Sequence, residues 1–171
     1  MLAERNRGVG FARDVAVKST AQLLGHPLHP VLIPYPFALL TSSTVFDLAE
    51  RVTNRPEFSR TAGHIATAGL GTAVLAALPG IVDYFGSVPR GTTARRQATQ
   101  HALLNLSALA CFALAESRRS RDRRQTAAGL SFSVAGTLLL SAGGWLGGEL
   151  VYHDGIAVNE DAPHVHPRAL P

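Results

Sequence analysis

Residues 125–148 read QTAAGLSFSVAGTLLLSAGGWLGG, and these 24 positions contain no Asp, Glu, Lys or Arg. An α-helix rises about 1.5 Å per residue, so about 20 apolar residues are enough to cross the roughly 30 Å hydrocarbon core of a bilayer. A surface helix of a soluble protein would instead carry charges along one face, with a period of about 3.6 residues. This stretch therefore predicts a membrane-spanning helix.

Three further stretches have the same character. They are 19, 22 and 19 residues long, and they also lack the four charged residue types. The hydrophobic fraction of the whole chain, 46%, is ordinary, so the prediction rests on where the charges lie, which is in the gaps between the stretches. The three stretches are Leu28–Phe46, Thr61–Val82 and Gln97–Ala115.

The spacing of the stretches predicts the fold. We expect an all-α integral membrane bundle of four antiparallel transmembrane helices with short loops, because short connections force neighbouring spans to run in opposite directions. Overlapping Gly-x-x-x-Gly pairs in residues 143–148 predict close packing of helices in lipid. The transmembrane domain is expected at 23–155, with spans at about 28–48, 61–85, 97–116 and 126–152, a polar N-terminal segment at 1–22 and a polar C-terminal tail at 156–171.

The charge pattern argues against a nucleic-acid partner and predicts an orientation. The net charge is +4 at pH 7, but the densest basic run, residues 118–124, lies between two spans and has no interleaved aromatic residues. Such a run is typical of a cytoplasmic loop. Each side of the membrane carries eight Lys and Arg in total, but all those in the first and third loops lie close to span ends. We therefore expect both termini to face outside.

Six ionisable residues are expected at the membrane face that carries the termini. An antiparallel path brings together the starts of spans one and three and the ends of spans two and four. Ionisable groups at such positions are costly, which makes them candidate functional groups. His64 and Asp47 fall at the opposite end. The six residues are His26, His29, Asp83, His101, Glu149 and His153.

The first hypothesis for this face is a redox cofactor, foremost haem b. Histidines inside a bundle of four helices can supply axial imidazoles, and burial then sets the potential. His29 with His101 is the preferred pair, with His26 and His153 as alternates. Asn105 lies four positions after His101 on the same helix face, so it is a candidate to orient that imidazole.

Two other hypotheses use the same residues. A non-haem transition-metal site would draw on nitrogen and oxygen ligands. Alternatively, the polar group is a hydrogen-bonded lock in a structural or assembly subunit, with Asp83 capping a loop and Glu149 paired with Arg95 or Arg96. The candidate metal ligands are His26, His29, Asp83, His101 and Glu149.

Several of these motifs resemble one known family. The run Gly25-His-Pro-Leu-His-Pro-Val-Leu-Ile-Pro-Tyr-Pro-Phe, followed by Asp47-Leu48, is similar to the opening of the bacterial membrane family catalogued as domain of unknown function 2231. Further similarity lies in Pro79-Gly80 with Asp83, in His101-Ala-Leu-Leu-Asn105, and in residues 144–152. The resemblance implies a four-span bacterial inner-membrane protein. Some members are joined to Rieske-type iron–sulfur domains, which implies a Rieske-type or cytochrome redox partner.

Overall fold

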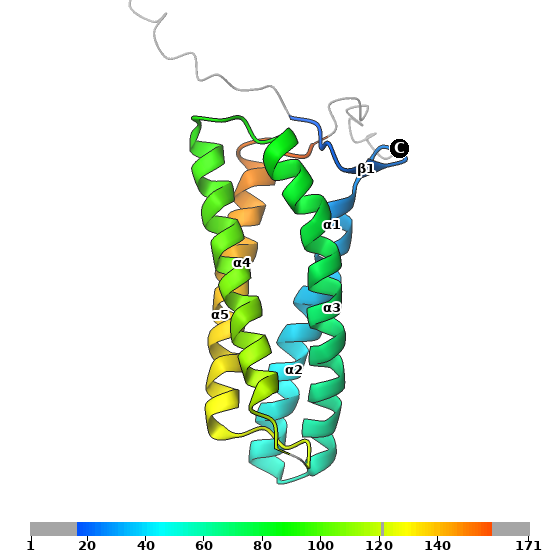
Figure 1. Cartoon of the computed structure of the whole chain (residues 1–171), viewed down its shortest axis with the longest axis vertical. Helices are drawn as coiled ribbons and strands as arrows, with labels where there is room; N and C mark the ends of the chain where they lie inside the picture. The colour runs from blue at the N-terminus through cyan, green and yellow to red at the C-terminus, as the bar shows by residue number, and fades with distance from the viewer. Residues whose placement is uncertain (1–16, 121, 159–171) are drawn as a thin grey trace, which may run out of the picture.

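The computed structural model describes residues 17–120 and 122–158. Four helical segments in this part are long and apolar enough to cross a membrane, and successive segments run in opposite directions (Figure 1). The predicted all-α membrane bundle is confirmed. Most of the two predicted polar tails lies outside the described residues. The helices are α1 (Leu28–Leu32), α2 (Pro34–Thr53), α3 (Pro56–Gly86), α4 (Thr93–Ser117) and α5 (Ala127–Tyr152).

The first span is divided in two at Ile33. Pro34 and Pro36 have no N–H group and cannot donate to the preceding turn, so a new helix begins at Pro34. Backbone bonds from Ile33 to the carbonyl of His29, 3.1 Å, and from Phe37 to the carbonyl of Ile33, 3.2 Å, keep the chain helical across the division. The short helix α1 carries His29 and packs against α3.

The ends of the long helices follow from local sequence. Asn54 ends α2 in the left-handed region, with φ of 55°, and Pro56 starts α3 two residues later. Asparagine tolerates that conformation better than most residues, so the turn between the helices is tight. Thr92 and Thr126 cap α4 and α5, because their hydroxyl oxygens accept the N–H groups of Arg95 and Gly129, at 3.1 and 3.0 Å.

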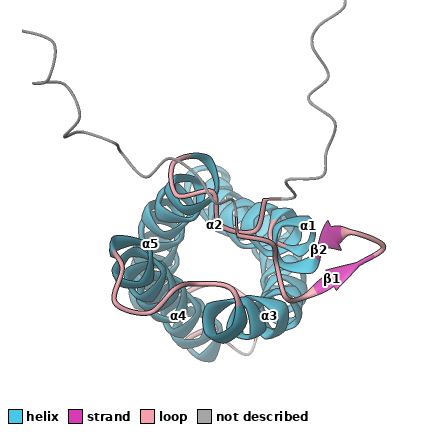
Figure 2. Cartoon of the chain, turned by 90° about the horizontal axis from the view of Figure 1, so that it is seen from above, coloured by secondary structure: helices cyan, strands magenta, loops and turns pink. Residues whose placement is uncertain are grey.

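The long helices form two hairpins. α2 packs mainly against α3, and α4 mainly against α5. Seen from above, the helices follow one another around the bundle in the order α2, α5, α4, α3 (Figure 2), so that α2 and α4 are diagonal neighbours. Leu40 of α2 and Phe112 of α4 belong to one buried cluster at the centre. The site described below lies where the two hairpins meet.

The face that carries the chain ends is closed by short backbone pairings. β1 (Gln22–Leu23) and β2 (His26–Pro27) form a small antiparallel hairpin beside α1. Val17 forms a parallel bridge with Ile156, and Ile156 packs in a buried cluster with Leu150. The segment before the first helix is therefore joined to the segment after the last one.

Shortening Leu40 should destabilise the bundle. Leu40 is fully buried, with 0% exposure, and Leu40→Ala removes its contacts with Gly69 and the central cluster. We expect a loss of about 3 kcal/mol in the free energy of unfolding, measured by denaturation in mild detergent. Leu103, on α4 and 59% exposed, is the matched control. An equal loss in Leu103→Ala would contradict the assignment of Leu40 to the interior.

Candidate functional site

His29 is held against α3 by one hydrogen bond and one glycine. Its Nδ1 lies 2.7 Å from the carbonyl oxygen of Ala76. Because a carbonyl can only accept, Nδ1 carries a proton, and in the neutral form of the ring Nε2 keeps its lone pair. The ring rests on Gly80, where an added Cβ would lie 2.8 Å from Nδ1. The imidazole therefore occupies the space that a side chain at position 80 would fill.

His101 is held in the same way within the second hairpin. Its Nδ1 lies 2.7 Å from the carbonyl oxygen of Gly143 on α5, and a Cβ on Gly147 would lie 2.9 Å from its Cε1. The side-chain nitrogen of Asn105 lies 3.3 Å from both ring nitrogens and donates to the backbone carbonyl of His101 at 2.9 Å. Asn105 thus contacts the imidazole, as its spacing from His101 led us to expect.

The two imidazoles meet between the hairpins. Their ring centroids are 6.2 Å apart, and the rings are perpendicular, with an interplanar angle of 90°. His29 comes from the first hairpin and His101 from the second, and each is fixed by a carbonyl of its own hairpin. The structure therefore brings together the preferred pair of the sequence analysis.

Asp83 has a different set of partners. Its carboxylate accepts bonds from the hydroxyl of Ser19 at 2.8 and 2.9 Å, and from the backbone N–H groups of Thr20 and Ala21 at 2.8 and 3.0 Å. Ser87 adds a bond of 3.3 Å. The carboxylate therefore anchors the segment that precedes the first helix, whereas the alternative reading had it cap the loop that follows α3.

The remaining predicted ligands do not join the pair. His26 is exposed on the β-hairpin, where its Nδ1 lies 3.0 Å from the carbonyl of Leu24. Glu149 faces His153 at 3.6 Å, and the predicted alternative partner Arg95 contacts the carbonyls of Tyr84 and Val88 instead. Among the described residues no three His, Cys, Asp or Glu side chains come close enough to share a metal ion. The predicted five-ligand metal cluster is therefore not formed there, because hydrogen bonds direct its members elsewhere.

A second polar group lies at the opposite end of the bundle. Arg119 makes a bidentate pair with Asp47 at 2.9 and 2.8 Å and binds Glu116 at 2.8 Å. The hydroxyl of Ser59 donates to Asp47 at 2.9 Å and accepts from the backbone N–H of Gln125 at 3.0 Å. This group, the Arg119 network, connects α2, α3 and the end of α4 with the residues that lead into α5.

The Arg119 network is buried and charged. The side chains of Arg119 and Asp47 are 4% and 1% exposed. Burial alone would lower the pKa of Arg119, but its hydrogen bonds to the carboxylates of Asp47 and Glu116 outweigh that effect and raise the pKa above its ordinary value. Arg119 therefore stays protonated. A second pair, Arg124 with Glu50, lies beside it.

The sequence did not predict this network, because Arg119 lies among four other arginines in a run that is typical of an exposed loop. Arg119 belongs to the basic run at 118–124, which the sequence presents only as cytoplasmic charge. Asp47 at the end of the first uncharged stretch was the available signal, since a buried carboxylate needs a cation. His64, which shares this end, has an exposed side chain on α3.

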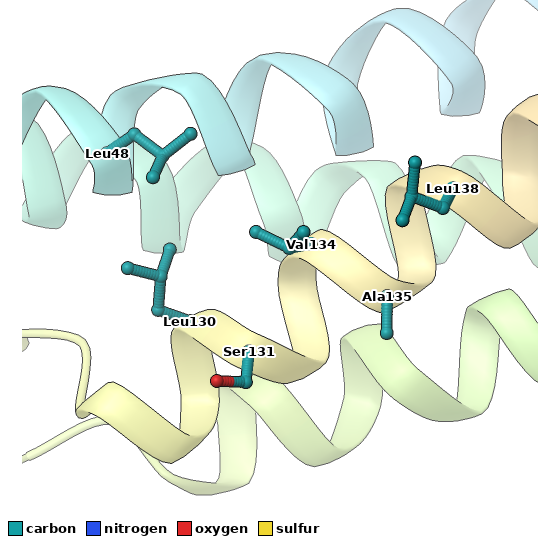
Figure 3. Close-up of a pocket in the computed structure, with 6 residues that line it drawn as sticks. All are labelled: Leu48, Leu130, Ser131, Val134, Ala135 and Leu138. Atoms are coloured by element: carbon teal, nitrogen blue, oxygen red, sulfur yellow. The ribbon is translucent and has the colours of Figure 1, made fainter.

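An apolar groove of about 400 Å³ runs between α2 and α5 in the half of the bundle remote from the histidines. Figure 3 shows Leu48 of α2 facing Leu130 and Val134 of α5 across it. Ser131 is the one polar residue among those that line it. The groove offers no group for acid–base or metal chemistry, so the histidine pair remains the candidate site.

Comparison with known proteins agrees with the sequence motifs. Residues 25–160 match the family described as "Predicted membrane protein (DUF2231)". The chain belongs to this family. The matched range includes both histidines of the pair and the whole bundle, and the family description supports a location in a membrane. Comparison with curated proteins and with solved structures gave no match.

Breaking the Arg119 network should cost more than breaking a surface pair. In Asp47→Asn the buried guanidinium loses its bidentate carboxylate, and we expect a loss of about 3 kcal/mol in the free energy of unfolding. Arg55→Ala is the control, since Arg55 pairs with Glu57 while their side chains are 63% and 53% exposed, and it should leave the unfolding temperature near the wild-type value. Equal shifts in thermal unfolding in detergent would show that the network does not hold the helix ends together.

Proposed function

We propose that the protein is a membrane electron-transfer subunit in which His29 and His101 would hold a redox cofactor, foremost haem b. The observation that carries the proposal is the state of the two rings. Each Nδ1 donates to a backbone carbonyl at 2.7 Å, which leaves each Nε2 as the coordinating nitrogen. Imidazoles that bind metals are commonly fixed by such a bond on the other nitrogen.

The spacing of the rings suits a shared metal centre. An imidazole nitrogen binds a metal at about 2 Å, so a centroid separation of 6.2 Å would allow both rings to reach one metal ion. Among the described residues no third ligand joins the pair. Two imidazoles alone would suit haem, which brings its remaining ligands with it.

The residues around the pair have separate tasks. The carbonyls of Ala76 and Gly143 hold the protons of the two Nδ1 atoms and raise the basicity of each Nε2. The amide of Asn105, 3.3 Å from Nε2 of His101, would have to move aside for that nitrogen to hold the cofactor. Bound haem would supply one-electron transfer, with a potential set by axial ligation and burial.

A second candidate is a structural or assembly subunit in which the histidines only join helices. It is supported by the same two bonds, because each imidazole connects neighbouring helices of one hairpin. In lipid such inter-helix hydrogen bonds contribute to packing. This candidate requires no ligand on either Nε2, which makes the two functions separable by spectroscopy.

The cofactor is tested by a reduced-minus-oxidised visible spectrum of the protein purified in mild detergent, with elemental analysis of the same sample. We expect a Soret shift with α and β bands and one iron per chain. His29→Ala and His101→Ala should each abolish the bis-imidazole spectrum. His64→Ala is the control and should retain it, because His64 is exposed at the far end of the bundle.

Two results would contradict the haem proposal. One is a flat spectrum in protein made with an ample haem supply and shown to be folded. The other is an equal loss of signal in all three histidine variants. A flat spectrum combined with lower thermal stability in His29→Ala and His101→Ala would support the structural subunit.

We further propose a bacterial inner-membrane location with both termini outside, and a Rieske-type or cytochrome protein as the electron partner. The eight Lys and Arg of the first and third loops support this orientation, and similarity to family members that carry Rieske-type domains supports the partner. The end of the bundle with the Arg119 network would then face the cytoplasm.

Orientation is tested by labelling single cysteines in intact cells with a reagent that does not cross the membrane. In a Cys111→Ala background, Thr93→Cys should react and Ser120→Cys should not. Both positions are exposed, and they lie at opposite ends of the bundle. Labelling of Ser120→Cys alone would reverse the orientation.

A further inference from the structure

Two contacts at opposite ends of the bundle join residues with the same separation in the sequence. His29 and His101, whose rings meet, are 72 positions apart. Asp47 and Arg119, which form the buried ion pair at 2.8 Å, are also 72 positions apart. Each contact therefore joins one position of the first hairpin to the position 72 residues later in the second.

The buried positions of α2 and α4 obey the same shift. Every buried residue of α4 from Ala108 onwards lies 72 positions after a buried residue of α2. Such residues point toward the centre of the bundle, so α2 and α4 present the same face inward. The matched pairs are Pro36 with Ala108, Leu40 with Phe112, and Ser43 with Ala115.

The second helices of the hairpins match with a shift of 67. All six buried residues of α5 lie 67 positions after a buried residue of α3. The shift is smaller because the connection from Asp47 to Ala62 is five residues longer than the one from Arg119 to Gly129. The pairs are Ala62 with Gly129, Ala66 with Ser133, Gly69 with Gly136, Ala73 with Leu140, Ala76 with Gly143, and Asp83 with Leu150.

The contacts that hold the two imidazoles repeat as well. His29 donates to the carbonyl of Ala76 and rests on Gly80, four residues later; His101 donates to the carbonyl of Gly143 and rests on Gly147, again four residues later. Both distances to the carbonyl are 2.7 Å.

A second contact with a glycine lies eleven positions after the histidine in each hairpin. Leu40, eleven positions after His29, rests on Gly69, and Phe112, eleven positions after His101, rests on Gly136. A Cβ on Gly69 would lie 2.8 Å from Leu40, and a Cβ on Gly136 would lie 2.9 Å from Phe112. One hairpin thus reproduces both the histidine–glycine contact and the apolar contact with glycine of the other.

We infer that the bundle consists of two copies of one helix hairpin, related by a two-fold axis along the bundle, and that the site is built from two equivalent half-sites. Each half-site is an imidazole, the backbone carbonyl that fixes its tautomer, and the glycine on which it rests. The diagonal placement of α2 and α4 in Figure 2, with both running in the same direction, is the arrangement that such an axis requires.

Equivalent half-sites define the class of ligand, and this step rests on the proposed function. A ligand on the axis must present the same face to both imidazoles. A tetrapyrrole-bound metal would meet this requirement, and His29 and His101 would then hold it. Gly80 and Gly147 are then positioning residues, since each fixes where one Nε2 points without touching the ligand.

The test is nitrogen-15 NMR of histidine-labelled full-length protein in detergent, without added cofactor, assigned with His29→Ala and His101→Ala. In wild type, His29 and His101 should each be protonated at Nδ1. Gly80→Ala should abolish the signal pattern of His29, and Gly147→Ala that of His101, because the new methyl group overlaps the ring.

Matched controls separate positioning from packing. Gly69→Ala and Gly136→Ala introduce a similar overlap with Leu40 and Phe112 and should lower stability while leaving both imidazole patterns in place. Gly71→Ala meets open space and should change neither. If only one of Gly80 and Gly147 controls its histidine, or if Gly69→Ala and Gly136→Ala abolish the patterns equally, the two half-sites are not equivalent and the inference fails.

A second arm distinguishes this failure from failure of the haem proposal. The same variants are titrated with haemin, the iron protoporphyrin, and Gly80→Ala and Gly147→Ala should each weaken binding about tenfold. If the NMR results are as expected but haemin does not bind to wild type, the proposed function and its ligand class are overturned. The two equivalent half-sites are then still supported. Haemin binding to wild type that only one of the two variants weakens would overturn the equivalence.

Discussion

The bundle depends on the close approach of the two helices within each hairpin. Lipid chains are as apolar as leucine, so no hydrophobic force draws helices together in the bilayer, and packing contacts and hydrogen bonds have to do so. Leu40 against Gly69 and Phe112 against Gly136 provide that packing at the centre of the bundle. The imidazoles of His29 and His101 fit between the helices of their hairpins because the residues that face them, Gly80 and Gly147, are again glycines.

Close packing at the centre leaves the polar groups to the two ends, and the ends differ in chemistry. At one end two imidazoles meet, each with its Nδ1 bonded to a backbone carbonyl. At the other, the donors of Arg119 are taken up by Asp47, Glu116 and Ser59. A saturated buried pair is suited to holding helices, whereas an imidazole fixed through Nδ1 is suited to binding a metal through Nε2. This contrast supports the histidine end as the candidate site.

Hydropathy and spacing were sufficient to predict the four spans, their antiparallel path and the end of the bundle at which each polar residue lies. They could not predict which polar residues meet at that end. His29 and His101 are directed inward. His26, however, lies on a β-hairpin that the hydropathy pattern does not predict, and Asp83 is hydrogen-bonded to Ser19 and to backbone N–H groups of the segment before the first helix. Contacts made by loops and lead-in segments depend on folded backbone positions, and sequence periodicity carries no information about those.

The pair Asp47 and Arg119 explains why two hairpins in one chain differ from a dimer of identical hairpins. A two-fold axis brings equivalent positions together, and identical copies would place two like charges in contact in a buried site, which is strongly unfavourable. Two copies within one chain can carry different residues there, and here they carry opposite charges at 2.8 Å. At the other end, two histidines meet with their ring centroids 6.2 Å apart, and that position carries the same residue in both copies. The same geometry thus accounts for a charge difference at one end and a residue identity at the other.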